Sequence, residues 1–179
     1  MDKYYQIKIA GLTRNLPLCS LSEKLDIAGF VMFGDVEITV ACANELIKVI
    51  PECEVIVTAE SKGIPLAYEM AKQLGIKYVV ARKAKKLYMR DPIEVEVQSI
   101  TTKGKQSLIL DSNETEFIKN KKVLIVDDVI STGESLAAVE KLVEYAEGNI
   151  VGKCCVLAEG TAAEREDIIY LEPLPLFFK

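Results

Sequence analysis

The alternation of short apolar runs with helical stripes constrains the fold of this chain more than any other feature. The run "VIVTA" at 55–59 is short and rich in β-branched residues, which is typical of a buried strand. In "IPLAYEMAKQLG" at 64–75, apolar residues are spaced as on one face of a helix, with Pro65 in the first turn and Gly75 at the end. A second strand, "KYVVA" at 77–81, completes a strand–helix–strand unit.

The same order returns in the second half of the chain. The run "VLIV" at 123–126 precedes a helical stretch at 134–148, and the apolar run "IVGKCCVLA" at 150–158 follows. Strands that alternate with helices in this way form βαβ units, and strands that are apolar throughout need helices on both faces. The sequence therefore predicts the α/β class, with a mainly parallel sheet flanked by helices. Cys154 and Cys155 are adjacent on a predicted strand, so we expect their side chains on opposite faces.

The other segments do not follow this order. In "IEVEVQSITTKGKQSLIL" at 93–110, apolar and polar residues alternate ahead of the turn-like "TTKGK", which predicts a two-stranded antiparallel flap. We expect a single domain over residues 1–179, with 51–159 as its core. Residues 1–50 together with 160–179 are expected to form a smaller accessory layer, or hood. The apolar end "LEPLPLFFK" is expected to pack on that layer or on another subunit.

Composition excludes several classes of function. The net charge of −5 argues against general binding to nucleic acid. The apolar runs are shorter than the roughly 18 residues of a membrane span, and the N-terminus lacks the pattern of a signal peptide. We therefore expect a cytoplasmic protein without a membrane partner. The absence of histidine excludes Ser-His-Asp and Cys-His catalysis, and five cysteines without a C-x-x-C pair fit reduced thiols.

Three polar features follow predicted strands, and the carboxyl ends of parallel strands share the edge of a sheet where ligands bind. In the first feature, Asp127 and Asp128 follow "VLIV", and "STGES" at 131–135 precedes a helix. The N–H groups and hydroxyls of such a loop suit a phosphate, while two carboxylates suit the hydroxyls of a sugar, or a metal. The alternative is that these residues only cap the helix.

The other two features are less specific. "ESKG" at 60–63 also joins a strand to a helix and offers a lysine and a glycine, but an ordinary turn has the same composition. "ARKAKKLYMR" at 81–90 gathers five basic residues, for which a solvated charge run is the usual explanation. Taken together, three anion-binding features on one edge predict a ligand that carries phosphate at both ends.

The stretch "VLIVDDVISTG" resembles the signature of the type I phosphoribosyltransferases, which bind phosphoribosyl pyrophosphate. The stretch from Thr58 to Leu87 resembles the pyrophosphate loop and following segment of adenine phosphoribosyltransferases. Parts of it, with the flap, also resemble the effector domain of the bacterial purine repressor. The likeness runs from about Val55 to Leu157. It implies the type I phosphoribosyltransferase fold, with a flexible antiparallel flap and a small hood layer.

The resemblance also implies roles for single residues. Asp127 and Asp128 would be the catalytic pair that holds the ribose 2- and 3-hydroxyls, and Ile130 would be an apolar wall for the base. Mg2+ would be held mainly through the donor and water. Pyrophosphate would be bound in a loop that often contains a non-proline cis peptide in this family. The 5-phosphate residues would be Ser131, Thr132, Gly133, Glu134 and Ser135, and the pyrophosphate residues Glu60, Ser61, Lys62, Lys83 and Lys86.

The predicted function is a magnesium-dependent purine phosphoribosyltransferase of purine salvage, with adenine as the favoured base and AMP and pyrophosphate as products. Hypoxanthine, guanine and xanthine stay open, because the hood would select the base. Thr102 stands where the adenine enzymes carry a flap glutamate, and Glu134 replaces the second glycine of the usual phosphate loop. We also expect a homodimer.

Two other functions remain open. A non-catalytic sensor of phosphoribosyl pyrophosphate is the first, since the purine repressor uses the same fold in that way. The second is a different α/β enzyme, with magnesium on Asp127 and Asp128 for phosphoryl transfer, although the chain has no G-x-x-x-x-G-K-[ST] loop.

Overall fold

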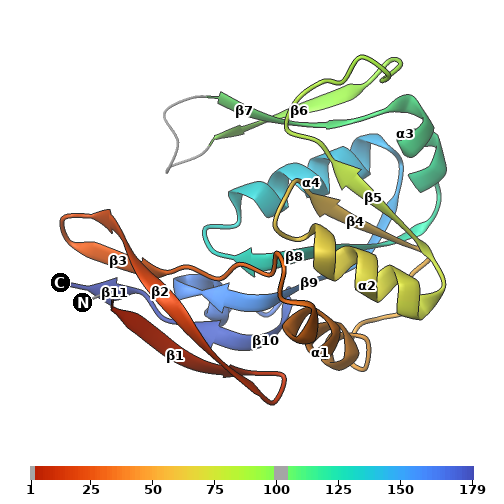
Figure 1. Cartoon of the computed structure of the whole chain (residues 1–179). Coiled ribbons are helices and arrows are strands. Elements are labelled where there is room, and N and C mark those ends of the chain that lie inside the picture. The colour runs from red at the N-terminus through yellow and green to blue at the C-terminus, as the bar shows by residue number, and fades with distance from the viewer. Residues whose placement is uncertain (1–2, 99–104) are drawn as a thin grey trace.

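The computed structural model describes residues 3–98 and 105–179, and a five-stranded sheet lies at its centre (Figure 1). The strand order is β10-β9-β8-β4-β5, and every neighbouring pair is parallel. The strands are β4 (Val55–Ala59), β5 (Lys77–Ala81), β8 (Lys122–Ile130), β9 (Asn149–Glu159) and β10 (Ile169–Leu174). The predicted α/β class is confirmed, and β4 and β5 have the bounds expected from the sequence.

Helices cover both faces of this sheet. They are α1 (Val36–Leu46) and α2 (Ile64–Leu74) on one face, and α3 (Ser112–Ile118) and α4 (Glu134–Tyr145) on the other (Figure 1). Successive strand residues enter opposite cores: Val57 packs on the α4 side and Ile56 on the side of α1 and α2. Cys154 and Cys155 divide in the same way, as expected, and both are fully buried. No helix among the described residues is long and apolar enough to span a membrane.

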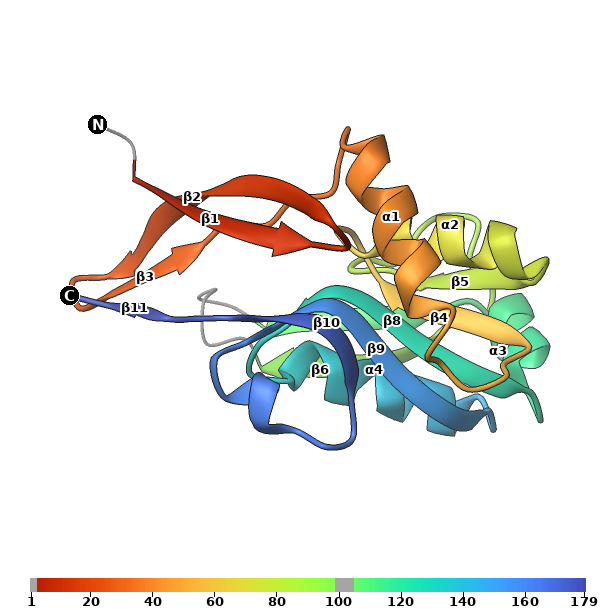
Figure 2. The same cartoon turned by 90° about the horizontal axis from the view of Figure 1, so that it is seen from below.

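The accessory layer is a separate antiparallel sheet of order β1-β2-β3-β11, which we call the hood (Figure 2). Its strands are β1 (Tyr4–Ile9), β2 (Leu12–Ser22), β3 (Leu25–Ala28) and β11 (Phe177–Phe178). The Phe177 ring packs edge-on against Tyr5, with the ring centroids 5.1 Å apart. The apolar C-terminal end therefore packs on the hood, which is one of the two places expected for it.

The hood is smaller than the sequence suggested. Residues 160–179 were assigned to it, but β10 pairs with β9 and extends the central sheet. Only a short 3-10 helix, η1 (Gly160–Glu164), lies in the connection between these strands, so the strand–helix rhythm gives no sign of the fifth strand. Helix α1 also lies outside the hood, because it packs against α2 and buries Cys42 and Leu46 in the core.

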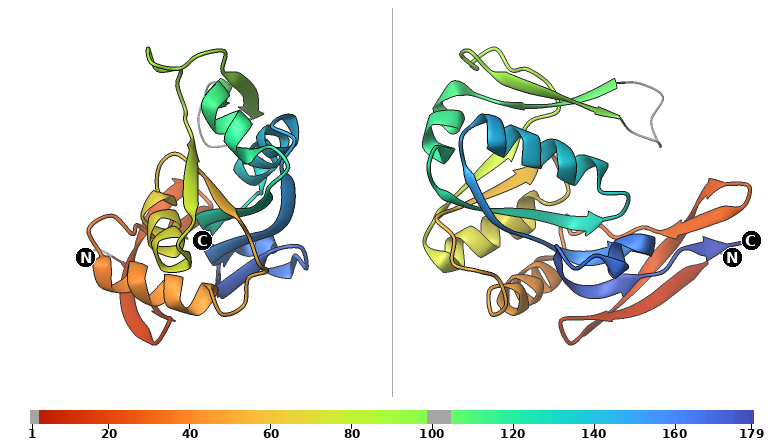
Figure 3. Two further views of the ribbon diagram at one scale, coloured as in Figure 1. Left: turned by 90° about the vertical axis from the view of Figure 1, so that its right-hand side faces the viewer. Right: turned by 180° about the vertical axis from the view of Figure 1, so that it is seen from behind.

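The predicted flap is confirmed as an antiparallel pair, β6 (Ile93–Gln98) and β7 (Lys105–Leu110) (Figure 3). Most of its predicted turn, Thr102 included, lies outside the described residues. Val95 and Leu110 are buried in the core together with side chains of α4. The base of the flap is therefore part of the core.

A two-bond bridge ties the flap to the segment after β5. The backbone N–H of Arg82 donates to the carbonyl oxygen of Ile109, and the N–H of Ile109 donates to that of Arg82, each at 2.8 Å. The basic segment that begins at Arg82 is thereby fixed to strand β7 of the flap.

Candidate active site

The acidic pair lies where the central sheet opens between two strands. Strand β8 continues through Asp127 and Asp128 to Ile130, rather than ending at Val126 as expected, because β9 pairs with it over its whole length. On its other side, β4 pairs with β8 only as far as Ile125. The two aspartates therefore lie beside a gap in the sheet, and both carboxylates line the pocket that occupies it.

The loop after β4 closes tightly against the acidic pair. Its Glu60–Ser61 peptide bond is cis, as the resemblance implies for this loop. A Cβ atom on Gly63 would lie 2.6 Å from Thr58 Oγ1 and 3.0 Å from Asp127 Oδ1, closer than side-chain carbons approach such atoms. A glycine is therefore needed for the loop to lie this close to the aspartates.

Lys62 of this loop pairs with the more deeply buried acid. Its Nζ lies 2.9 Å from Asp128 Oδ2, and the Asp128 side chain is 4% exposed. Lys62 Nζ also donates a long hydrogen bond, 3.5 Å, to the carbonyl oxygen of Phe30. Because Phe30 lies between β3 and α1, this lysine connects the acidic pair with the segment that leaves the hood.

Asp127 is held by the backbone of its neighbour. Its Oδ1 accepts a 2.8 Å hydrogen bond from the N–H of Asp128. Burial raises the pKa of Asp127 well above its ordinary value, and the adjacent charge of Asp128 acts in the same direction. Two adjacent carboxylates, of which Asp128 alone pairs with Lys62, suit ligand groups that donate hydrogen bonds, such as the hydroxyls of a sugar.

Glu60 organises the basic segment after β5. Its Oε2 accepts hydrogen bonds from the backbone N–H of Lys83 at 2.9 Å and from Arg82 Nε at 3.3 Å. The bond from Lys83 holds the pKa of Glu60 below its ordinary value, and the charges of Arg82 and Lys86 also lower it. The carboxylate that was predicted to bind pyrophosphate thus holds the segment that carries the lysines.

A pocket of about 190 Å3 lies between these segments. The predicted residues that line it are Glu60, Ser61, Lys62, Lys83, Asp127, Asp128 and Ser135. Val129 and two flap residues, Ser107 and Leu108, also line it and were missed. The alternating pattern of the flap does not reveal which residues overhang the sheet, because that depends on the bridge between Arg82 and Ile109.

A second pocket, of about 110 Å3, adjoins the first at Asp127, Val129 and Ser135. All the predicted 5-phosphate residues, 131–135, line it. Gly133 precedes α4 in the left-handed conformation, with φ of 83°, and no side chain of the described residues caps this helix. The N–H groups of the first turn are therefore free to bind an anion.

Two predicted residues stand apart. Ile130 lines the second pocket, but its side chain is 3% exposed and packs in the core on the α4 side. Val129 packs towards the hood instead, so the two residues face opposite sides of the sheet. The role of Ile130 as a wall for the base stays a prediction.

Lys86 is not among the described residues that line either pocket, and its backbone N–H contacts Met89 Sδ at 3.4 Å.

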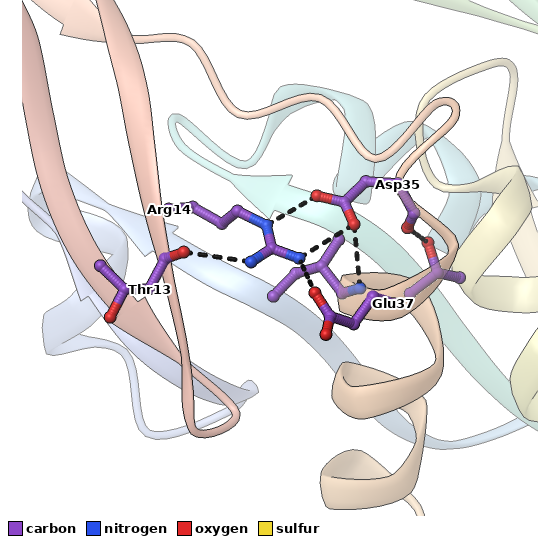
Figure 4. A network of polar contacts seen from close by, with 6 residues as sticks. Thr13, Arg14, Asp35 and Glu37 are labelled. Carbon is purple, nitrogen blue, oxygen red and sulfur yellow. Dashed lines mark hydrogen bonds and ion pairs between the residues drawn. The ribbon is translucent and has the colours of Figure 1, made fainter.

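An ion-pair network joins the hood to α1 (Figure 4). Arg14 of β2 places Nε 2.7 Å from Asp35 Oδ2 and Nη2 2.7 Å from Glu37 Oε2. Asp35 also caps α1 by accepting a 3.1 Å hydrogen bond from the N–H of Ile38, and the bond from Arg14 lowers the pKa of Asp35. The network fixes the end of the Phe30 segment where it enters α1. Sequence reasoning missed Arg14, because its partners lie 21 and 23 residues away.

Comparisons with known proteins agree with this geometry. The family described as "Phosphoribosyl transferase domain" matches residues 43–173. The adenine phosphoribosyltransferase of Natranaerobius thermophilus is 36% identical over 132 residues, which cover 74% of this chain and 73% of that protein. The hypoxanthine/guanine phosphoribosyltransferase of Methanothermococcus okinawensis is 38% identical over 123 residues, 68% of this chain and 63% of that protein.

The fold has relatives among solved structures. The adenine phosphoribosyltransferase of Thermoanaerobacter pseudethanolicus gives a TM-score of 0.68 at 23% identity, covering 79% of this chain and 84% of that one. At this level of identity the likeness concerns the fold alone.

Proposed function

Because the chain belongs to the phosphoribosyltransferase family, we propose that it transfers ribose 5-phosphate from phosphoribosyl pyrophosphate to a purine base and releases pyrophosphate. The observation that carries this proposal is the position of Asp127 and Asp128 between two pockets. One pocket is lined by Lys62 and Lys83, and the other by the start of α4. If the donor binds with its pyrophosphate in the first pocket and its 5-phosphate in the second, its ribose lies beside Asp127 and Asp128.

The charges of the site suit the transition state of this transfer. The bond from the anomeric carbon to pyrophosphate breaks, a bond to a ring nitrogen of the base forms, and the proton of that nitrogen is released. Positive charge grows on the ribose and negative charge on the leaving group. The carboxylates of Asp127 and Asp128 stabilise the first, while Lys62 and Lys83 stabilise the second. The flap residue Leu108 lines the same pocket and helps to exclude water.

The site fits a magnesium ion that is shared with the donor. Asp127 and Asp128 offer oxygen ligands at the pocket, and the described residues contain no cluster of three or more acidic, cysteine or histidine side chains. Such an ion would take its other ligands from the donor and water. When bound, it neutralises charge on the pyrophosphate.

We propose adenine as the base and salvage of free purine as the role, with hypoxanthine, guanine and xanthine as the competing bases. Adenine is favoured by the relative from Natranaerobius thermophilus, whose matched length is the greater of the two. The test is a panel of these four bases with donor and magnesium, read by release of pyrophosphate. We expect turnover with adenine. No turnover with any purine at high enzyme concentration would contradict the enzymatic function.

A sensor of the donor is the second candidate. It is favoured by Thr102, which stands where a glutamate is expected in a catalytic flap. Calorimetry that detects binding of phosphoribosyl pyrophosphate, in a protein that turns over no base, would support this function. If the Asp127→Asn, Asp128→Asn double variant bound the donor as tightly as the wild type, both candidates would fall.

We also propose a homodimer. Val31, Phe33 and Val36, around the start of α1, are exposed apolar side chains, and Tyr68 of α2 adds to them. These residues offer a surface for a second copy of the chain. Sedimentation equilibrium that gives the mass of one chain at micromolar concentration would contradict this assembly.

A further inference from the structure

Arg165 lies directly over the loop that begins α4, although nothing in its sequence position connects it with that loop. It follows η1, and its Nη1 is 2.6 Å from the position that a Cβ atom on Gly133 would take. Any side chain at position 133 would therefore collide with the guanidinium. The glycine leaves the arginine in close contact with the backbone of this loop.

A clamp of ion pairs fixes the direction of the guanidinium. Arg165 Nε and Nη2 donate to the two carboxylate oxygens of Asp167, at 2.8 and 2.7 Å. Lys153 Nζ in turn donates to Asp167 and to Glu140 of α4, both at 2.6 Å. A planar guanidinium group that is held by hydrogen bonds at two of its nitrogens can take only one orientation. None of the described residues accepts a hydrogen bond from Nη1, and this is the nitrogen that faces Gly133.

The charge of the second pocket explains why a cation is needed here. The described residues that line it include two acids, Asp127 and Glu134, but no lysine or arginine. Helix N–H groups and the hydroxyls of this loop would have to hold a phosphate dianion in a pocket that Glu134 also lines, and like charges repel. Arg165, behind Gly133, supplies the missing positive charge.

We propose that Arg165 is the charge partner of the donor's 5-phosphate, acting from behind Gly133 and oriented by Asp167; this rests on the proposed function. The pyrophosphate end of the donor lies with Lys62 and Lys83, on the other side of the acidic pair. The proposal therefore separates the two ends of the donor, and each end can be probed by its own ligand.

The test is calorimetry of the full chain with ribose 5-phosphate and, separately, with magnesium pyrophosphate. In Arg165→Gln we expect affinity for ribose 5-phosphate to fall roughly ten-fold or more, the loss of one positive charge close to the phosphate, while affinity for pyrophosphate is unchanged. Arg165→Lys keeps the charge but not the bidentate contact with Asp167, so it should recover part of the affinity. Lys119→Gln is the matched control, since it removes one positive charge from an ion pair with Glu147 far from the carboxyl edge of the sheet.

The outcomes separate the two levels of the proposal. If the wild type binds neither ligand, the proposed function fails, and this inference with it. If the wild type binds both but Arg165→Gln binds ribose 5-phosphate as tightly, only the inference is overturned. Equal losses in the Gln and Lys variants, or equal losses for the two ligands, would show that the guanidinium serves the shape of the loop rather than the charge of the phosphate. Either result would also overturn it.

Discussion

At the scale of single residues, the buried carboxylate of Asp127 beside Asp128 serves ligand binding but lowers the free energy of unfolding. Its raised pKa means that the folded protein retains a proton at pH values where the unfolded chain has lost it. The free energy of unfolding therefore falls as pH rises from the ordinary value of 3.8 through the raised pKa, and stays lowered above it. Above the raised pKa the folded protein carries the whole of this penalty.

The variant Asp127→Asn should consequently be more stable than the wild type at pH 8, because the amide keeps the Oδ1 acceptor for the N–H of Asp128 without a buried charge. We expect the difference in melting temperature to shrink as pH is lowered towards 4, where the carboxyl group is protonated. The same variant should bind the donor more weakly. Melting curves across pH measure the first effect, with the exposed residue change Glu144→Gln as control. A lower melting temperature at pH 8 would contradict the prediction.

At the scale of elements, the flap is fixed to the core at its base. Leu110 is fully buried with side chains of α4, so Leu110→Ala should lower the free energy of unfolding by about 2–5 kcal/mol, as truncations in a packed core do. Leu87→Ala is the matched control, because Leu87 is fully exposed in the loop before the flap. Urea denaturation measures both. Equal stabilities of the two variants would mean that the base of the flap does not pack on α4.

The elements that could be predicted are those with a local signal. Strands β4 and β5 are short apolar runs, helix α2 had both the periodicity and the end signals, and Gly75 does adopt the left-handed conformation that ends α2. The end of β8 could not be predicted, because it is set by pairing with β9 and by the loss of pairing with β4. The hood and β10 lack a helical stripe beside them, so the repeat pattern did not identify them.

At the scale of the whole molecule, the hood shares one buried apolar cluster with α1, α2 and the central sheet, and ion pairs add further fixed points. Arg14 is one of them, since it ties β2 to Asp35 at the start of α1 and so fixes the segment of Phe30 beside Lys62. In Arg14→Gln we expect KM for the base to rise about five-fold, the effect of losing roughly 1 kcal/mol, with little change in KM for the donor. Steady-state kinetics with each substrate varied in turn measures both constants. Equal increases in the two would contradict a role confined to the hood.

The topology of the whole molecule also explains how much of the site could be predicted from the sequence. Asp127 and Asp128 lie near the carboxyl end of β8, and the loops at 60–62 and 131–135 follow strands of the same parallel sheet, so topology alone brings them to one edge. Ser107 and Arg165 reach that edge from segments whose paths depend on distant contacts. For Arg165 the distant contact is the hydrogen bond from Lys153 to Asp167, the residue that holds the guanidinium, and it leaves no pattern in the sequence.

The bridge between Arg82 and Ile109 joins two parts of the first pocket. One is the flap, which lines it with Leu108, and the other is the segment that carries Lys83. A ligand that draws Lys83 inward would therefore act on strand β7 of the flap through these two hydrogen bonds. Exclusion of solvent by the flap and approach of the Lys83 ammonium group would then occur together. Both would begin when the pyrophosphate group binds and end when it leaves.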